Sequence, residues 1–138
     1  MYDSWLVYSG ASSHLFGYKE FLSNLVEKET SLKIIPGENS TYLVKGFGSI
    51  EFDLESLESV LLHEVMYVPR VKKNLVSISS LEDKGMRVAF IKGKFLTWPM
   101  KSHMRDGFTL GSRAEGLYRF NGKPLLAMIH DINNKSEL

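Results

Sequence analysis

Apolar and polar side chains alternate in short segments along this chain, and this period of two restricts the fold more than any other feature. Ile50, Phe52 and Leu54 alternate with Glu51 and Asp53. Successive side chains of a β-strand point to opposite faces, so such a segment buries one face and exposes the other. Because similar segments recur between glycine-containing turns, we predict an all-β, mainly antiparallel fold.

Three glycine-containing turns are predicted to close β-hairpins. Gly46-Phe47-Gly48 separates the β-prone run 41–45 from the alternating strand that begins at Ile50. Lys92-Gly93 and Asn121-Gly122 each lie between two runs rich in apolar and β-branched residues. Turn formers between two such runs are typical of hairpins.

Two segments favour helix over strand. Asn74 is placed to cap a helix whose apolar side contains Leu75, Ile78 and Leu81, and Gly85 suits the left-handed position after its end at Lys84. The run from Tyr18 to Val26 has apolar residues at helical spacing, and we expect a second short helix there.

Length and composition predict an ordered domain with one core. The chain has 138 residues, of which 43% are hydrophobic and 24% charged, and no apolar run is long enough to span a membrane. Trp5, Phe16 and Phe52 are predicted core residues. The formal net charge is +1, which gives no general reason to expect nucleic acid or a membrane as a partner.

Cysteine is absent, and the first residues show no basic segment followed by an apolar one. Both observations fit a reducing compartment, and we expect an intracellular protein, cytoplasmic or nuclear. No cofactor is expected. His63, His103 and His130 stand apart from one another without acidic or cysteine neighbours at ligand spacing, so we expect no metal site.

The segment from Trp5 to His14 contains an apolar strand that runs into a turn of small residues, Ser9-Gly10-Ala11-Ser12-Ser13. It resembles the active-site segment of the proteases in copia-type retrotransposon polyproteins, which reads Trp-x-x-Asp-Ser-Gly-Ala-Ser-x-His. Tyr8 stands where that family has its catalytic aspartate. The resemblance implies a retropepsin-like fold, a small closed β-barrel with one short helix.

A second segment carries the same resemblance. Glu64–Pro69 followed by Lys73–Ser79 is similar to the family's Val-Leu-Tyr-Val-Pro and Asn-Leu-Leu-Ser motifs, which form a strand leading into the helix. Gly46-Phe47-Gly48 is similar in place to the flap that covers the substrate, so the resemblance implies that these residues and Ala11 line the substrate cleft.

The last third of the chain is similar to the run into the pre-integrase segment of the same polyproteins, beginning at Gly116-Leu117-Tyr118-Arg119-Phe120. We therefore predict a protease-like domain over residues 1–110 and a connector into a truncated pre-integrase segment over residues 111–138. In the alternative, residues past 110 add strands to the same domain.

Tyr8 removes the chemistry that the resemblance would otherwise imply. A retropepsin dimer brings together one aspartate from each subunit, and the pair shares a proton while it activates water. A phenol ionises only near pH ~10 and cannot act as the general base. Asp3 would lie roughly 16 Å away along an extended strand. Ser9 and Gly10 are therefore interpreted as the scaffold of a site that has lost its catalytic acid.

Other candidate sites have simpler interpretations. Ser12, Ser13 and His14 lack the nucleophile elbow and the orienting acid of a serine hydrolase, and His14 is interpreted as a polar turn residue. Arg70, Lys72 and Lys73 form a small basic cluster that we interpret as a solvated loop.

Two functions remain open from the sequence. The first is an inactive protease-like domain that still folds, forms a homodimer or holds a peptide in its cleft. The second is a repurposed interaction module that pairs with other retropepsin-like subunits, where a mixed dimer would contain one aspartate. The bulk of Tyr8 at the dimer axis would hinder assembly in either case.

Overall fold

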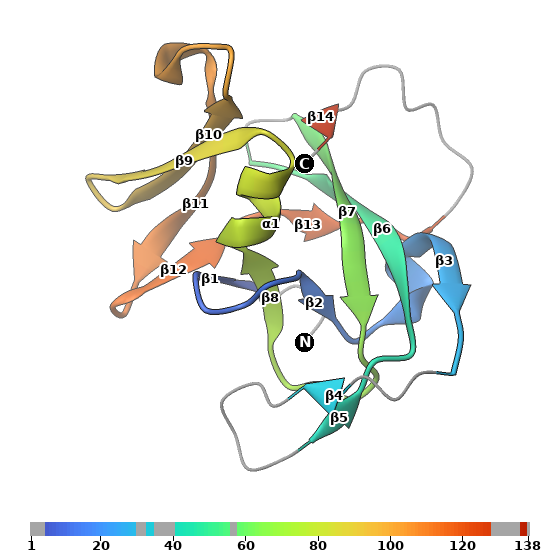
Figure 1. Cartoon of the computed structure of the whole chain (residues 1–138). Helices are drawn as coiled ribbons and strands as arrows, with labels where there is room; N and C mark the ends of the chain where they lie inside the picture. Colours follow the sequence, from blue (N-terminus) through green and yellow to red (C-terminus); the bar gives the residue numbers. More distant parts are fainter. Residues whose placement is uncertain (1–4, 30–32, 35–40, 56–57, 128–135, 138) are drawn as a thin grey trace.

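The computed structural model describes residues 5–29, 33–34, 41–55, 58–127 and 136–137, and of residues 33–34 and 136–137 only the backbone. Short β-strands dominate, with one α-helix and two 3-10 turns (Figure 1). The strands are β1 (Trp5–Tyr8), β2 (Leu15–Phe16), β3 (Leu22–Glu27), β4 (Lys33–Ile34), β5 (Tyr42–Leu43), β6 (Gly46–Asp53), β7 (Ser59–Tyr67), β8 (Asn74–Ser77), β9 (Met86–Ile91), β10 (Lys94–Pro99), β11 (Phe108–Ala114), β12 (Leu117–Phe120), β13 (Lys123–Pro124) and β14 (Ser136–Glu137). The helices are η1 (Lys19–Phe21), α1 (Ile78–Asp83) and η2 (Met104–Asp106).

Most strands belong to one mixed sheet, whose order is β13-β6-β7-β2-β8-β1-β12-β11-β10-β9. Strand β3 pairs with β6 and β14 with β7, whereas β4 and β5 form a separate hairpin. The β1/β8, β2/β7 and β14/β7 pairs are parallel, and the other pairs are antiparallel. The all-β prediction is confirmed. Between the described strands the sheet is open, since its end strands β13 and β9 do not pair with each other.

Aromatic side chains form the centre of the main core. Trp5 stacks on Phe16 with ring centroids 4.9 Å apart, and its edge contacts with Phe52 and Phe120 have centroid distances of 5.2 and 6.1 Å. All four side chains are buried, which confirms the prediction for Trp5, Phe16 and Phe52. Phe120 comes from β12, so residues beyond 110 help to build this core.

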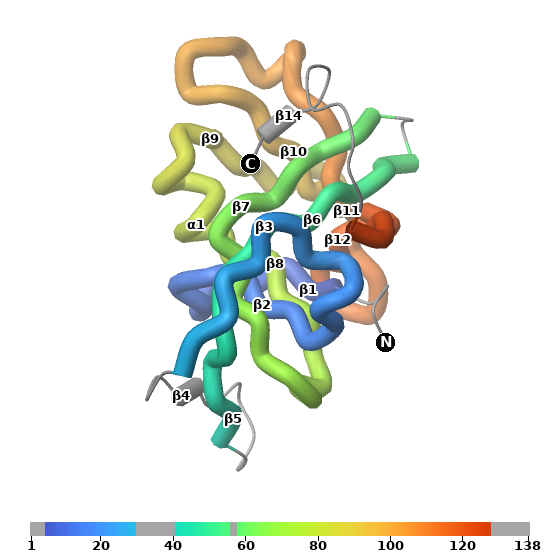
Figure 2. The backbone as a smooth tube through the Cα atoms, turned by 90° about the vertical axis from the view of Figure 1, so that its right-hand side faces the viewer, coloured from blue at the N-terminus to red at the C-terminus, as the bar shows by residue number. Residues whose placement is uncertain are grey.

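The two views show the sheet as a curved body with a projection at each end. Strands β9 and β10 extend from one end and the β4–β5 hairpin from the other (Figures 1 and 2). A second apolar cluster, here called the lower cluster, contains Leu15, Val44, Val68, Val71 and Leu75. No helix in the described part of the chain is long and apolar enough to cross a membrane.

The hairpin predicted at Lys92-Gly93 is confirmed, and the hairpin predicted at Asn121-Gly122 is wrong. Lys92 and Gly93 have positive φ angles of 51° and 78° and join β9 to β10. Asn121-Gly122 closes no hairpin, because β13 turns away to pair with β6. Strand β12 pairs instead with the preceding β11, across a Glu115-Gly116 turn with φ angles of 54° and 79°.

The first predicted helix is confirmed with a later start. Residues 74–77 form β8, and the hydroxyl of Ser77 caps α1 by accepting a 3.1 Å hydrogen bond from the Ser80 N–H. Gly85 takes the expected left-handed conformation, with a φ of 83°. The helix predicted from Tyr18 to Val26 is wrong: a single 3-10 turn leads into β3, whose pairing with β6 outweighs a weak helical pattern.

Candidate functional site

Tyr8 is the last residue of β1, the strand that carries the protease-like motif. Trp5 and Val7 point to the main core, so Leu6 and Tyr8 point to the opposite side of the sheet. Strand β1 runs parallel to β8, with Tyr8 in register with Ser77, the residue immediately before α1. Its side chain is half exposed, at 50%. Tyr8 therefore presents its ring at the junction of two parallel strands and a helix.

The ring of Tyr8 lies over Gly10. A Cβ atom added at Gly10 would be 2.9 Å from Cζ of Tyr8 and 3.0 Å from its hydroxyl oxygen. Ser9 and Gly10 are themselves exposed in the turn after β1. The glycine thus provides the space that the bulky ring occupies.

The small-residue turn is attached to the start of α1 by two serine side chains. The hydroxyl of Ser77 donates a 2.6 Å hydrogen bond to the carbonyl of Ala11, and that of Ser80 donates a 3.2 Å hydrogen bond to the carbonyl of Ser12. Ser77 is fully buried. These two contacts hold the turn, and with it the position of Tyr8, against the helix.

His14 is buried, and the interpretation of it as a polar turn residue is wrong. Its Nδ1 accepts a 2.9 Å hydrogen bond from the backbone N–H of Ser77, so the neutral ring carries its proton on Nε2. Among the described residues Nε2 has no hydrogen-bond partner. Burial lowers the pKa of His14 to about 4, with the neighbouring Glu64 raising it and Lys84 lowering it further. A neutral imidazole is therefore part of the scaffold under the turn.

Glu64 and Lys84 form an ion pair near this imidazole. Nζ of Lys84 lies 2.9 Å from Oε1 of Glu64, and this hydrogen bond is the main cause of a lowered pKa at the Glu64 carboxyl. Both side chains reach solvent, so the pair contributes little to stability. The five residues of the turn between Tyr8 and His14 carry no carboxyl group.

Gly46, Phe47 and Gly48 lie inside β6, and the prediction that they form a hairpin tip is wrong. Strand β3 pairs with them on one side and β7 on the other. A Cβ at Gly46 would overlap the carbonyl of Val26, and one at Gly48 would lie 3.1 Å from the carbonyl of Ser23. The two glycines therefore serve the close approach of β3 rather than a turn.

Of the residues expected at the cleft, Ala11 and Phe47 share one neighbour, the lower cluster. Both are half-buried and pack against the lower cluster. The hairpin that stands apart from the main sheet is formed by β4 and β5, which pair through Lys33↔Leu43 and Ile34↔Tyr42. Its strands precede Gly46, and the residues between them lie outside the described part of the chain. The run 41–45, expected to pair with the strand at Ile50, contains β5, which pairs with β4 instead.

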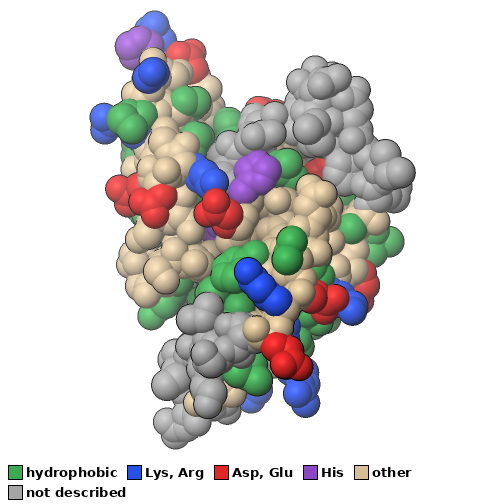
Figure 3. Space-filling model, turned by 45° about the vertical axis from the view of Figure 1, so that its right-hand side comes forward, with side chains coloured by type: hydrophobic (Ala, Val, Ile, Leu, Met, Phe, Trp, Pro, Cys, Tyr) green, Lys and Arg blue, Asp and Glu red, His purple; other side chains and the backbone are tan. Residues whose placement is uncertain are grey.

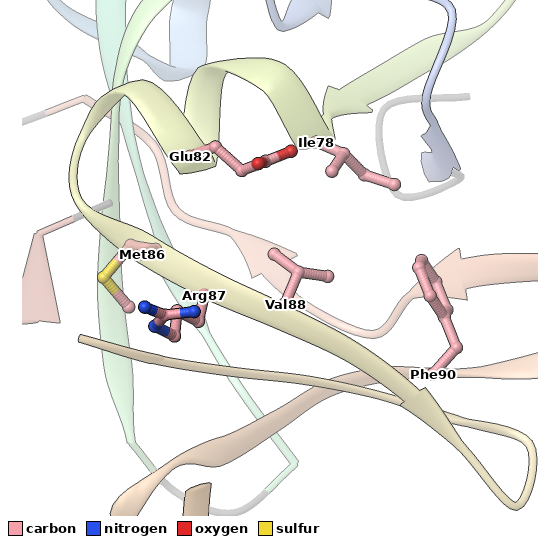
Figure 4. Close-up of a pocket in the computed structure, with 6 residues that line it drawn as sticks. All are labelled: Ile78, Glu82, Met86, Arg87, Val88 and Phe90. Carbon is pink, nitrogen blue, oxygen red and sulfur yellow. The ribbon is translucent and has the colours of Figure 1, made fainter. Parts of the chain in front are cut away.

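A pocket that the sequence did not predict lies between α1 and β9 (Figure 4). It encloses about 240 Å³. Val88 and Phe90 point from β9 toward Ile78 of α1, with Glu82 above and Met86 and Arg87 at the other end (Figure 4). The alternation of Met86, Val88 and Phe90 indicates a strand face but cannot reveal that a helix stops short of covering it.

The comparison with known families matches residues 5–86 to the model described as Pol polyprotein, beta-barrel domain. This chain belongs to the Pol polyprotein beta-barrel domain family. The match begins at Trp5 and ends at Met86, so it contains Tyr8, the serine-tethered turn and α1. No curated protein and no solved structure matches.

The Pol family assignment supports the part of the resemblance that concerns a retroelement polyprotein. Strands β10 to β14 and nearly all of β9 lie beyond the matched residues, although β12 pairs with β1 inside the same sheet. The Pol domain of this chain is thus completed by strands that the family model does not include. In the described part of the chain, no group of three or more His, Asp or Glu side chains is arranged to hold a metal ion.

Proposed function

We propose that this chain is the retropepsin-like domain of a copia-type retrotransposon polyprotein and that it has no peptidase activity. The position of Tyr8 carries the proposal. It ends β1 in parallel register with Ser77, directly before α1, and begins the turn that the family motif places at the catalytic centre. An aspartate at this position is what the motif requires, and the phenol of Tyr8 cannot replace it.

The chemistry explains why one side chain decides the activity. Peptide hydrolysis by an aspartic dyad needs two carboxyl groups that share one proton, so that one activates water while the other donates to the substrate. A symmetric dimer of this chain would present two phenols at that place. The turn between Tyr8 and His14 supplies no carboxyl group, and the nearby His14 is buried with a lowered pKa. Neither the phenol of Tyr8 nor the imidazole of His14 can therefore replace the missing carboxylate base.

The test is a peptide-cleavage assay on the unaltered chain, Tyr8→Asp and Tyr8→Asn. We expect no cleavage by the unaltered chain at acidic or neutral pH, and pepstatin-sensitive cleavage by Tyr8→Asp. Tyr8→Asn matches the aspartate in size but has no acid, so it should remain inactive. Pepstatin-sensitive cleavage by the unaltered chain would overturn the proposal, and so would equal rates for the Asp and Asn variants.

A second candidate is a non-enzymatic pairing module that forms a homodimer or joins an intact retropepsin-like subunit. Tyr8 and Leu117 favour it, because each is a large apolar side chain with 50% of its surface exposed. Tyr8 ends β1 and Leu117 begins β12, and these strands pair in antiparallel register through Trp5↔Phe120 and Leu6↔Arg119, so the two residues lie at the same end of the strand pair. Adjacent exposed apolar side chains are typical of an interaction surface.

Sedimentation equilibrium tests this candidate. We expect a dimer for the unaltered chain, or a mixed dimer with an intact subunit, and a monomer for Leu117→Lys. Lys28→Met, which adds an apolar side chain at an exposed position after β3, is a control that should leave the assembly unchanged. A strictly monomeric chain that binds no such subunit would exclude pairing, while the cleavage assay would still decide the first candidate.

The remaining expectations belong to the same proposal. We propose an intracellular protein, cytoplasmic or nuclear, with a protease-like part over residues 1–110 and a connector toward a pre-integrase segment over residues 111–138. The connector also contributes β12 to the sheet. A peptide held between Ala11 and Phe47 is the proposed non-catalytic use of the cleft.

A further inference from the structure

The charge of this chain is divided unevenly between the family-matched segment and the strands that follow it. Residues 5–86 contain eight Lys or Arg and eleven Asp or Glu, which gives a net charge of −3. Residues 87–127 contain eight Lys or Arg and only two Asp or Glu, which gives +6. A net charge near zero for the whole chain therefore hides a strongly basic C-terminal segment.

Four of these eight basic residues, Arg87, Lys94, Arg113 and Arg119, lie in a four-stranded lobe made of β9, β10, β11 and β12. Lys92 lies in the β9–β10 turn, Lys101 and Arg105 lie between β10 and β11, and Lys123 lies in β13. Lys and Arg side chains are seen at the upper-left end of the molecule in Figure 3, beside a histidine and an acidic side chain, where this lobe projects in Figure 1. Most of them, including Arg87, Lys94 and Arg113, are exposed. Such a one-sided field attracts polyanions and raises their rate of association.

One face of the lobe combines cations with an aromatic ring. Met86, Val88 and Phe95 point to the core, so the alternating positions form the opposite face, here called the outer face. The strand registers place Arg87 beside Trp98, and Lys94 beside Ser112, which lies beside Arg119. The outer face is defined by Arg87, Lys94, Leu96, Trp98, Ser112 and Arg119, of which Arg87 also lines one end of the pocket beside α1.

Trp98 is only half-buried on this face, and none of the strand residues that define the face is acidic. The two carboxylates of the segment lie outside these strands, Glu115 in the β11–β12 turn and Asp106 in η2, directly before Gly107, which lies against Trp98. A partly exposed indole next to arginine and lysine side chains offers a stacking surface for a base and charge for the phosphates around it. Bases inside a duplex are stacked on one another and cannot use such a surface.

We propose that the outer face binds single-stranded nucleic acid, with Trp98 stacked on a base and Arg87, Lys94 and Arg119 on phosphates. This departs from the expectation based on net charge alone, and it is independent of whether the chain cleaves peptides. Recognition is through the backbone and the π-face of the bases, so the binding has little sequence preference.

The binding test uses the whole chain and a fluorescein-labelled oligouridylate, followed by fluorescence anisotropy at increasing salt. Three phosphate contacts predict a slope of about −2 in a plot of log K against log salt. Arg87→Glu/Lys94→Glu should lower the affinity at least about tenfold. Lys28→Glu/Lys45→Glu makes the same change in net charge at two exposed lysines near β3 and β5, and should lower it by less than about threefold.

Tryptophan emission separates stacking from charge attraction. Trp5 is 1% exposed, so quenching on addition of oligouridylate reports on Trp98, the only other tryptophan. Trp98→Leu should abolish the quenching and weaken binding at least about fivefold. The proposal is overturned if oligouridylate does not bind saturably, or if it does not quench the tryptophan emission of the unaltered chain. It is also overturned if the two charge variants lose the same affinity for oligouridylate, or if the chain binds duplex RNA, polyglutamate or anionic vesicles as tightly as oligouridylate.

Discussion

The backbone N–H of Ser77 donates a 2.9 Å hydrogen bond to Nδ1 of His14, and both residues are buried. This contact joins the last residue of β8 to the end of the turn that begins at Tyr8. It requires an unprotonated Nδ1, because a protonated imidazole has no lone pair there to accept the bond. The scaffold beneath the candidate site therefore depends on a neutral histidine.

The first prediction is that the protein loses stability as the pH falls from about 6.5 to about 4. Burial lowers the pKa of His14 from 6.5 to about 4, so in this window the unfolded chain binds a proton that the folded chain does not. The stabilisation is complete above pH 6.5 and is lost as the pH decreases, by up to about 3 kcal/mol. Urea denaturation at a series of pH values measures it.

The control for this pH dependence is His14→Asn, whose amide oxygen can still accept from Ser77 but does not titrate. The unaltered chain should show a steeper loss of unfolding free energy toward low pH than the variant does. Parallel pH profiles for the two proteins would exclude His14 as the cause, since carboxyl groups such as Glu64 titrate in both.

Ser77→Ala is predicted to destabilise the protein by about 2 kcal/mol. The substitution removes the cap of α1 and leaves the carbonyl of Ala11 without the 2.6 Å hydrogen bond from this hydroxyl. Ser80→Ala, a matched change on the same helix, removes only an exposed 3.2 Å bond to Ser12 and should cost less than about 0.5 kcal/mol. Chemical denaturation of both variants measures the two losses of unfolding free energy. Equal losses would mean that the turn is not held by Ser77.

Tyr8→Asp is predicted to fold, with a loss of no more than about 1.5 kcal/mol. Half of the Tyr8 side chain is exposed, so only part of its apolar contribution is lost, and a carboxylate at this position stays in contact with water. Thermal unfolding followed by circular dichroism checks it. A variant that does not fold would show that the ring over Gly10 is a necessary part of the structure.

Phe120→Ala is predicted to cost about 3–5 kcal/mol, as expected for an aromatic side chain lost from a core. Phe120 is buried, and its ring centroid lies 4.7 Å from that of Phe52. Leu117→Ala on the same strand removes a half-exposed side chain and should cost less than about 1 kcal/mol. If Phe120→Ala leaves the denaturation midpoint unchanged, the Phe120 side chain does not contribute to the stability of this core.

Much of this arrangement could be predicted from the sequence because local signals and tertiary contacts agree there. The alternation around Ile50 predicts a strand, and that strand pairs with its neighbours as β6. The Lys92-Gly93 turn predicts a hairpin, and β9 and β10 form it. The position of Tyr8 at the end of β1 follows from the strand and the small-residue turn after it. Gly85 ends α1 because its left-handed conformation is costly for other residues.

The predictions that proved wrong concern partners that are distant along the chain. Gly46 and Gly48 were expected in a turn, but they lie in β6 because β3 approaches too closely for a side chain. Asn121-Gly122 has good turn residues, yet the strand before it pairs with β11 and the one after it with β6. The burial of His14 depends on the N–H of Ser77, 63 positions away, which no local pattern reveals.

Strand β12 also affects the order in which the polyprotein can fold during synthesis. Trp5 and Phe120 are partners in register although they are 115 positions apart. Strand β1 therefore has only one of its two edges paired until β12 has been synthesised, and until then the other edge is open to other chains. A break in the polyprotein between β10 and β12 would release an aggregation-prone fragment rather than a smaller stable domain.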